Sequence, residues 1–190
     1  VSDLEKDIRA LDEKPIIIGH SMGGLIAQIL ASRGLAKKLV LLTSAPPAGV
    51  MALRPSSTRT FLSVLTTWGF WNKPMRLTFN EAKYGILGLL TPAQQAAEYA
   101  KYSFESGQAA FEIAFWQLDG NKATHVDAKA ITCPILIISG GKDKIVPASV
   151  VKNIAKKYKK NNDVTYKEFK KFAHAIHQQK GWQEIAGFVA

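Results

Sequence analysis

The sequence predicts an α/β fold, in which a mostly parallel sheet of about four strands carries helices on both faces and an inserted helical lid. Continuous apolar runs at 15–19, 38–43 and 135–138 are typical of strands buried in a parallel sheet. A fourth run, at 164–169, alternates between apolar and polar residues. Residues 46–130 show helical patterns alone, so we expect the lid there.

Helices are expected between these strands. The spacing of Ser2 and Glu5 is that of a capping box and predicts a helix over 3–12. Apolar residues at helical intervals predict a second helix over 22–33, which Gly34 would end. The other helices are expected near 57–70, 80–90, 92–105, 107–118, 148–158 and 182–189. Strand, helix and strand with short connections indicate a doubly wound sheet.

The chain therefore divides into two core halves, residues 1–45 and 131–190, and a lid of residues 46–130. Most of the aromatic side chains lie in the lid. Lids over active sites use such side chains to line an apolar pocket, and we expect about three or four of them to touch substrate. For any single one, packing of the lid against the core is the alternative. The four expected in the pocket are Trp68, Phe111, Phe115 and Trp116.

Length and composition limit the class of protein. A chain of 190 residues with 47% hydrophobic residues suits one domain, or one domain with an inserted cap. No apolar run approaches the ~18 residues of a membrane-spanning helix, so no membrane span is expected. Cys133 has no second cysteine to pair with, and a buried structural thiol is favoured over a reactive one. We expect a cytoplasmic protein, although the absence of a signal peptide carries little weight in a chain that begins with Val1.

The net charge of +10 is unevenly distributed, because lysines greatly outnumber acidic residues over 142–180. Such a surface can hold nucleic acid or an anionic membrane. No nucleic-acid motif or interleaved aromatic accompanies it, so a solvated helix face is favoured and no nucleic-acid partner is expected. The lysines of the helix concerned are Lys152, Lys156, Lys157, Lys159 and Lys160.

Residues 19–24 read Gly-His-Ser-Met-Gly-Gly, between the first strand and the second helix. A Gly-x-Ser-x-Gly turn in this context is typical of the nucleophile elbow of serine hydrolases. Ser21 would occupy a tight, strained turn, and side chains in place of Gly19 or Gly23 are expected to collide with neighbouring backbone. Gly24 would let the helix pack close to the strand. A plain glycine-rich turn of an α/β protein is the alternative interpretation.

A serine nucleophile needs a base within hydrogen-bond reach and a carboxylate that orients this base. Ser21, Asp143 and His174 occur in the order that the elbow fold uses, and each follows a predicted strand. We therefore expect them to meet at one sheet edge as nucleophile, orienting acid and general base. The backbone amide of Met22, at the start of a helix, would face the oxyanion.

The acid has two rivals in the sequence. Asp119 and Asp127 lie in the lid or in the connection before the third strand. Asp143 directly follows that strand in a glycine-rich loop, where an acid would face the base. The alternative role for Asp143 is to cap the helix expected near 148.

The base has three rivals. His177 lies near His174 but closer to the final helix, and His125 is expected at the surface. His20 flanks the nucleophile and is expected to point away from Ser21 and to pack or hydrogen-bond locally. No acidic or cysteine cluster completes a metal site with His174 and His177, so no metal is expected.

Three segments resemble the α/β-hydrolase superfamily in its lidded branch of esterases, lipases, lactonases and carbon–carbon bond hydrolases. They are the elbow at 19–24, the strand and acid loop at 133–147, and the histidine segment at 172–176 followed by Gly181 and Trp182. The resemblance implies the same catalytic trio. Dehalogenases and epoxide hydrolases of this superfamily carry an aspartate nucleophile, and Ser21 argues against both.

The resemblance also implies that part of the fold lies outside this chain. Members usually have about four further strands and a helix before the elbow strand, whereas fourteen residues precede Pro15 here. Strand 15–19 would then have an open apolar edge, which a missing segment, a partner chain or self-association would cover. We expect a fragment of a longer gene product. The second oxyanion donor would also be missing, and such a loss costs about 10²–10³ in rate.

The leading hypothesis is a serine hydrolase of apolar small-to-medium carboxylic esters, lactones or thioesters, acting without a cofactor through an acyl-enzyme. The alternative is a catalytically incompetent fragment or a binding module with a basic surface.

Overall fold

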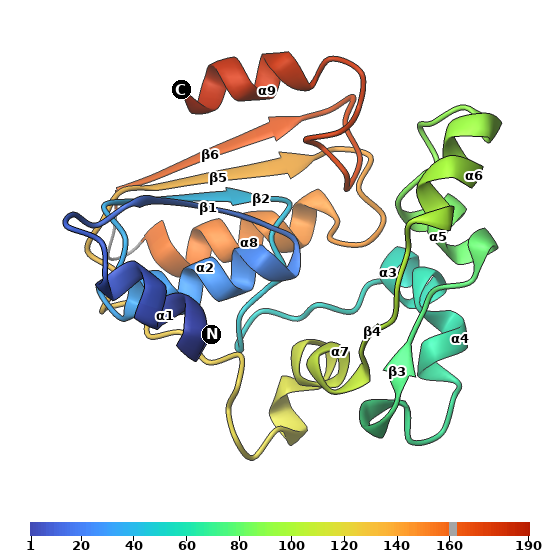
Figure 1. Ribbon diagram of the computed structural model, residues 1–190, viewed down its shortest axis with the longest axis horizontal. Helices are drawn as coiled ribbons and strands as arrows, with labels where there is room; N and C mark the ends of the chain where they lie inside the picture. The colour runs from blue at the N-terminus through green and yellow to red at the C-terminus, as the bar shows by residue number, and fades with distance from the viewer. Residues whose placement is uncertain (160–162) are drawn as a thin grey trace.

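The computed structural model describes residues 1–159 and 163–190 (Figure 1). Four strands form one parallel sheet in the order β1-β2-β5-β6, which confirms the predicted fold class. Gly19 pairs with Leu41, and Leu41 pairs with Ile137, so the strand that precedes Ser21 is held in register with the middle of the sheet. The strands are β1 (Ile16–His20), β2 (Lys38–Leu42), β5 (Ile135–Gly140) and β6 (Val164–Phe169).

Helices cover both faces of the sheet, as predicted. Figure 1 shows α2 (Met22–Ser32) and α8 (Ala148–Lys159) on one face and α9 (Trp182–Val189) on the other. The side chains of successive residues in a strand point to opposite faces of the sheet. Ile137 lies in the core beneath α2 and α8, and Ile138 lies in the cluster beneath α9. This double burial explains why the central strands are continuous apolar runs.

The first helix, α1 (Ser2–Arg9), forms without the predicted capping box. Its cap residue is Val1, which has no side chain that can accept a hydrogen bond from the helix amides. Glu5 instead binds the side chains of Arg9 and Arg33. The capping-box prediction is wrong because the helix begins one residue earlier and Glu5 is used for ion pairs.

Residues 46–130, the segment expected to form the lid and called the lid below, lie beyond the carboxyl ends of the parallel strands (Figure 1). The helices of the lid are shorter than predicted, and the lid has a separate hydrophobic cluster around Phe70, Leu77 and Leu87. Thr91 caps one of them together with Gln94. The lid helices are α3 (Pro55–Thr60), α4 (Leu62–Leu65), α5 (Phe79–Gly85), α6 (Pro92–Ala100) and α7 (Gly107–Ala114), with short 3-10 turns at Phe70–Asn72 and Trp116–Leu118.

The lid is not purely helical, which corrects the prediction for residues 46–130. Strand β3 (Pro74–Met75) pairs antiparallel with β4 (Glu105–Ser106). Two residues per strand are too few to give a periodic signal, so the sequence pattern could not reveal this ladder.

Two surface features follow the predictions. Strand β1 is an edge strand that, among the described residues, pairs with β2 alone, and Ile16 and Ile18 are 53% and 55% exposed. Lys152, Lys156 and Lys159 are exposed on α8, while Lys160 lies outside the described residues. In the described part of the chain, no helix has the length and apolar character needed to cross a membrane.

Candidate active site

Ser21 occupies a strained turn between the last residue of β1 and the first residue of α2. Its φ of 52° and ψ of −124° are unfavourable for a residue with a side chain. The backbone N–H of Ser21 donates to Leu42 O (3.1 Å), and its carbonyl accepts from Ala45 N (2.8 Å). The end of β2 therefore anchors the turn and keeps the hydroxyl at the sheet edge.

The three glycines around Ser21 differ in how much space a side chain would have. A Cβ at Gly19 would lie 2.5 Å from Gly23 O, so this position requires glycine. A Cβ at Gly24 would overlap the Ser44 side chain, which confirms the predicted close approach of the helix. A Cβ at Gly23 would meet nothing within 4 Å. The predicted collision at position 23 is therefore wrong, because this residue faces the open cavity.

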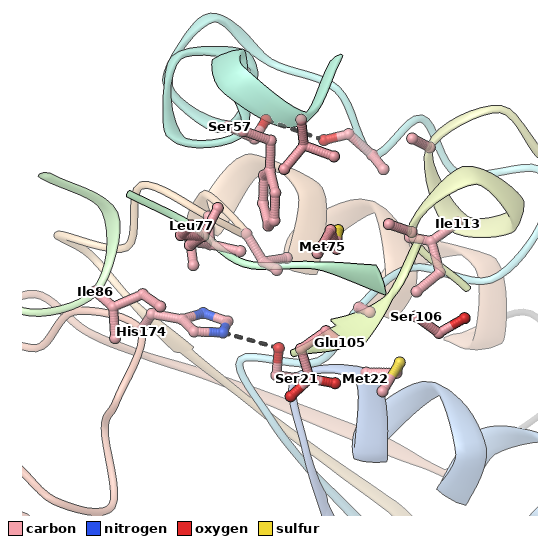
Figure 2. Close-up of a pocket in the computed structure, with 18 of the residues that line it drawn as sticks. Ser21, Met22, Ser57, Met75, Leu77, Ile86, Glu105, Ser106, Ile113 and His174 are labelled. Carbon is pink, nitrogen blue, oxygen red and sulfur yellow. Dashed lines mark hydrogen bonds between the residues drawn. The ribbon is translucent and has the colours of Figure 1, made fainter. Parts of the chain in front are cut away.

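The structure brings the three predicted side chains together. His174 Nε2 lies 2.8 Å from Ser21 Oγ, and His174 Nδ1 lies 2.8 Å from Asp143 Oδ2 (Figure 2). A carboxylate can only accept, so Nδ1 carries the proton and Nε2 is free to accept from the serine hydroxyl. Asp143 and His174 are 5% and 4% exposed, so water does not compete for their hydrogen bond.

The loop after β5 fixes the carboxylate of Asp143. Its second oxygen, Oδ1, accepts from the backbone N–H groups of Ile145 (2.8 Å) and Val146 (2.9 Å). The two rival aspartates serve local turns instead, since Asp119 accepts from Ala123 N and Asp127 accepts from Lys129 N.

His20 does not face Ser21, but its hydrogen bond is not local. His20 Nε2 lies 2.9 Å from the carbonyl oxygen of His174, 154 residues away in sequence. Burial lowers the pKa of His20 to about 4. The ring of His177 lies 4.5 Å from that of His20, and burial lowers its pKa as well. His125 is exposed, as expected.

A cavity of about 600 Å³ opens above Ser21, between the core and the lid. Figure 2 shows Ser21 and His174 at one end and Ser57 at the other, with lid side chains between them. Met22 lines the cavity beside Ser21 and begins α2, where backbone N–H groups have no acceptor within the helix. The cavity is lined by apolar side chains that include Leu53, Phe61, Val64, Leu77, Ile86 and Ile113.

None of the four aromatic residues predicted for the pocket lies on the cavity wall. Trp68 is 87% exposed, and Phe111 packs against Trp71 and Phe115 inside the lid. Trp116 lies in a 3-10 turn after α7. The prediction is corrected because composition reveals that a lid is aromatic but not which face of each short helix meets the core. The aromatic residues on the wall are Phe61, Phe70 and Tyr102.

The lid also contributes charged groups to the wall, which sequence reasoning missed. Arg76 and Lys101 line the cavity, but Lys101 pairs with Glu98 (2.7 Å) and Arg76 lies over the Tyr99 ring. Glu105 lies beside Ser21 and Met22 in Figure 2. The sequence did not predict that Glu105 lines the cavity, because the two-residue strand β4 that positions it is too short to show a periodic pattern.

Within the described residues, no group of three or more His, Cys, Asp or Glu side chains is arranged to hold a metal ion. Cys133 is a free, partly buried thiol, and burial raises its pKa. Both of its features argue against a nucleophilic role.

A parallel sheet whose first strand runs into a strained serine turn, with acid and histidine on later loops, defines an α/β hydrolase. A family model described as "Serine aminopeptidase, S33" matches residues 3–181. The chain belongs to this family, which confirms the resemblance to the α/β-hydrolase superfamily.

Solved structures share the fold. A monoacylglycerol lipase from Paleococcus ferrophilus is 22% identical with a TM-score of 0.64, over 99% of this chain and 70% of that one. An esterase from Exiguobacterium antarcticum is 18% identical with a TM-score of 0.64, over 99% of this chain and 71% of that one. A methylesterase from Arabidopsis is 10% identical with a TM-score of 0.63, over 98% of this chain and 72% of that one. A search of curated protein sequences finds no significant match.

Proposed function

We propose that this site hydrolyses carboxylic esters, including lactones and thioesters, through an acyl-enzyme on Ser21. The observation that carries the proposal is the unbroken hydrogen-bond chain from Ser21 through His174 to Asp143, with 2.8 Å at each step, at the floor of an apolar cavity. Similar structures, a lipase and two esterases among them, support the same class of reaction.

The chemistry follows from the proton positions. Ser21 Oγ attacks the acyl carbon while its proton passes to His174 Nε2, and Asp143 stabilises the resulting imidazolium. The Met22 amide stabilises the oxyanion of the tetrahedral intermediate. The intermediate then expels the alcohol, which takes the proton back from Nε2. A water molecule repeats these steps on the acyl-enzyme, which releases the acid and restores the serine.

The cavity supports an apolar acyl group of small to medium size as the substrate. Its volume of about 600 Å³ is in the ordinary range for small-molecule sites. Leu77 lies between the catalytic residues and Ser57 in Figure 2, and Ile86 lies beside His174, so an acyl chain would extend from Ser21 along apolar side chains. The charged side chains of the wall, Arg76, Lys101 and Glu105, lie on strand β4 or near it. We place the leaving group of the ester beside them.

A fluorophosphonate probe tests the proposal directly. We expect one probe molecule to attach to Ser21, as seen by intact mass and peptide mapping, and no attachment to Ser21→Ala. Turnover of p-nitrophenyl esters should then rise from acetate to medium chain lengths. An intact, folded chain that takes up no probe at Ser21 would contradict the proposal and favour a binding module instead.

A further inference from the structure

The backbone carbonyl of His174 accepts hydrogen bonds from three donors. Ile176 N, in the same loop, lies at 2.8 Å. The other two are side chains of neighbouring strands: His20 Nε2 lies at 2.9 Å and Thr43 Oγ1 at 3.0 Å. His20 ends β1, and Thr43 directly follows β2. The loop that presents the catalytic imidazole is therefore tied to the sheet by two side chains from the first two strands.

Thr43 has an unfavourable backbone conformation that serves this contact. Its φ of 43° lies in the left-handed region, which is rare for a β-branched residue. The residue is wholly buried, and its N–H donates to Ile138 O at 2.8 Å. The sheet thus holds the backbone while the hydroxyl reaches the carbonyl of His174. Strain retained at such a place points to a role in function.

His20 is suited to act as a permanent donor. A carbonyl oxygen can only accept, so Nε2 of His20 must carry the proton. The ring lies among three titratable groups, namely His174 (5.0 Å between ring centroids), His177 (4.5 Å) and, more remotely, Asp143. Burial beside two other imidazoles keeps His20 neutral at pH 7, because it lowers the pKa to about 4. His20 therefore donates its hydrogen bond without placing a positive charge next to the base.

We propose that His20 and Thr43 are positioning residues that hold the main chain of His174 so that Nε2 stays within reach of Ser21 Oγ. The inference rests on the proposed function, because it assigns His174 the role of base. Neither residue transfers a proton in the reaction. Both act through the backbone of the base, where a small displacement lengthens the 2.8 Å contact with the nucleophile.

Replacing Thr43 with isosteric valine removes one of the two anchors. We expect Thr43→Val to react with the fluorophosphonate about 2- to 10-fold more slowly at saturating probe, with the half-saturating concentration unchanged, as expected for one neutral hydrogen bond. Thr43→Ser keeps the hydroxyl and should restore the rate. Thr60→Val is the matched control, since Thr60 is also wholly buried and donates to a backbone carbonyl, Ser56 O at 2.9 Å, within lid helix α3. The control should lose stability but not the rate at Ser21.

A second measurement does not depend on turnover. In ¹⁵N-histidine-labelled protein, His20 should be the Nε2–H tautomer, and the low-field proton of His174 Nδ1 should shift or broaden in Thr43→Val and in His20→Phe, which keeps a ring but no donor. An Nδ1–H tautomer at His20 overturns the inference. So does an unchanged His174 resonance together with an unchanged probe rate. A different result is a wild-type chain that shows the expected His20 tautomer and His174 resonance but fails to react with the fluorophosphonate. That result overturns the proposed function and leaves the positioning contact supported.

Discussion

The Tyr84 ring of the lid lies 4.1 Å from the ammonium of Lys144, the residue that directly follows Asp143. The Arg59 guanidinium of α3 lies 4.2 Å from the same ring. Two cations therefore share one aromatic ring, and one of them belongs to the loop that carries Asp143. This contact links the lid to the core beside the active site.

Removing the ring should loosen the lid. Because one cation–π contact is worth about 0.5–1 kcal/mol, we expect Tyr84→Leu to raise KM for a medium-chain ester by about 2- to 5-fold and to leave kcat nearly unchanged. Tyr84→Phe keeps the contact and should resemble the wild type. Phe79→Leu removes an aromatic ring that packs on Tyr99 inside the lid and serves as the control. Equal effects of Tyr84→Leu and Phe79→Leu would contradict the link.

Replacing the carboxylate of Asp143 by an amide should lower the catalytic rate without lowering the stability of the fold. In Asp143→Asn the side chain can no longer accept at both oxygens, so the imidazole of His174 loses its fixed tautomer. We expect kcat to fall by about 10⁴-fold with little change in KM or in the unfolding midpoint. Asp127→Asn, which alters a turn-capping carboxylate on the surface, should have wild-type kinetics. An Asp143→Asn variant within tenfold of wild-type kcat would rule out the assigned role.

The buried histidines should make stability depend on pH. The pKa of His20 falls from its ordinary value of 6.5 to about 4 on folding, so the unfolded chain binds more protons between these pH values. The contribution of His20 to the free energy of unfolding should therefore be complete above pH 6.5 and be lost as the pH drops toward 4. His20 would contribute roughly 3 kcal/mol at most, and the lowered pKa of His177 acts in the same direction.

Urea unfolding at a series of pH values checks this expectation. His20→Gln should flatten the decline between pH 6.5 and 4, whereas His125→Gln, at an exposed position, should leave it unchanged. A wild-type stability curve that stays level through this window would contradict the expected burial of a neutral His20.

The open edge of β1 should promote association of the chain. Ile16 and Ile18 belong to this edge strand, which pairs with β2 on one side, and both are more than half exposed. Lysine on an edge strand opposes strand pairing, so Ile18→Lys should reduce concentration-dependent association in sedimentation velocity experiments. Leu118→Lys, at a lid residue that is 72% exposed, is the control for a general gain in charge. The edge would be excluded as the contact if both variants lowered association equally.

The strands and helices of the core could be predicted because their sequences show strong local hydrophobic patterns. Strand Val164–Phe169 and helix Trp182–Val189 coincide with their predicted bounds. The meeting of Ser21, Asp143 and His174 could be anticipated because each residue follows a strand, and parallel strands end at one edge. Chain order and strand ends therefore carry information about side chains that are far apart in the sequence.

The remainder depends on tertiary contacts that leave no local signal. The side of each short lid helix that meets the core decides which aromatic residues reach the cavity, and Trp68 shows that composition does not settle this. The positive φ of Thr43 has no signature either, because threonine is not a residue that favours this conformation. The distant partner of His20 is a backbone atom, which any residue at position 174 would offer.

The two-residue ladder of β3 and β4 joins parts of the lid that are far apart in sequence. The segment between them, 76–104, contains α5 and α6, and outside the ladder its Tyr84 contacts Arg59 of α3 and Lys144 of the core. Leu77 and Ile86 of the cavity wall belong to this segment, whereas Phe61 and Ile113 lie outside it. A swing about the ladder would move Leu77 and Ile86 away from Phe61 and Ile113 once the Tyr84 contacts break, while the sheet, the serine turn and the histidine loop keep their geometry.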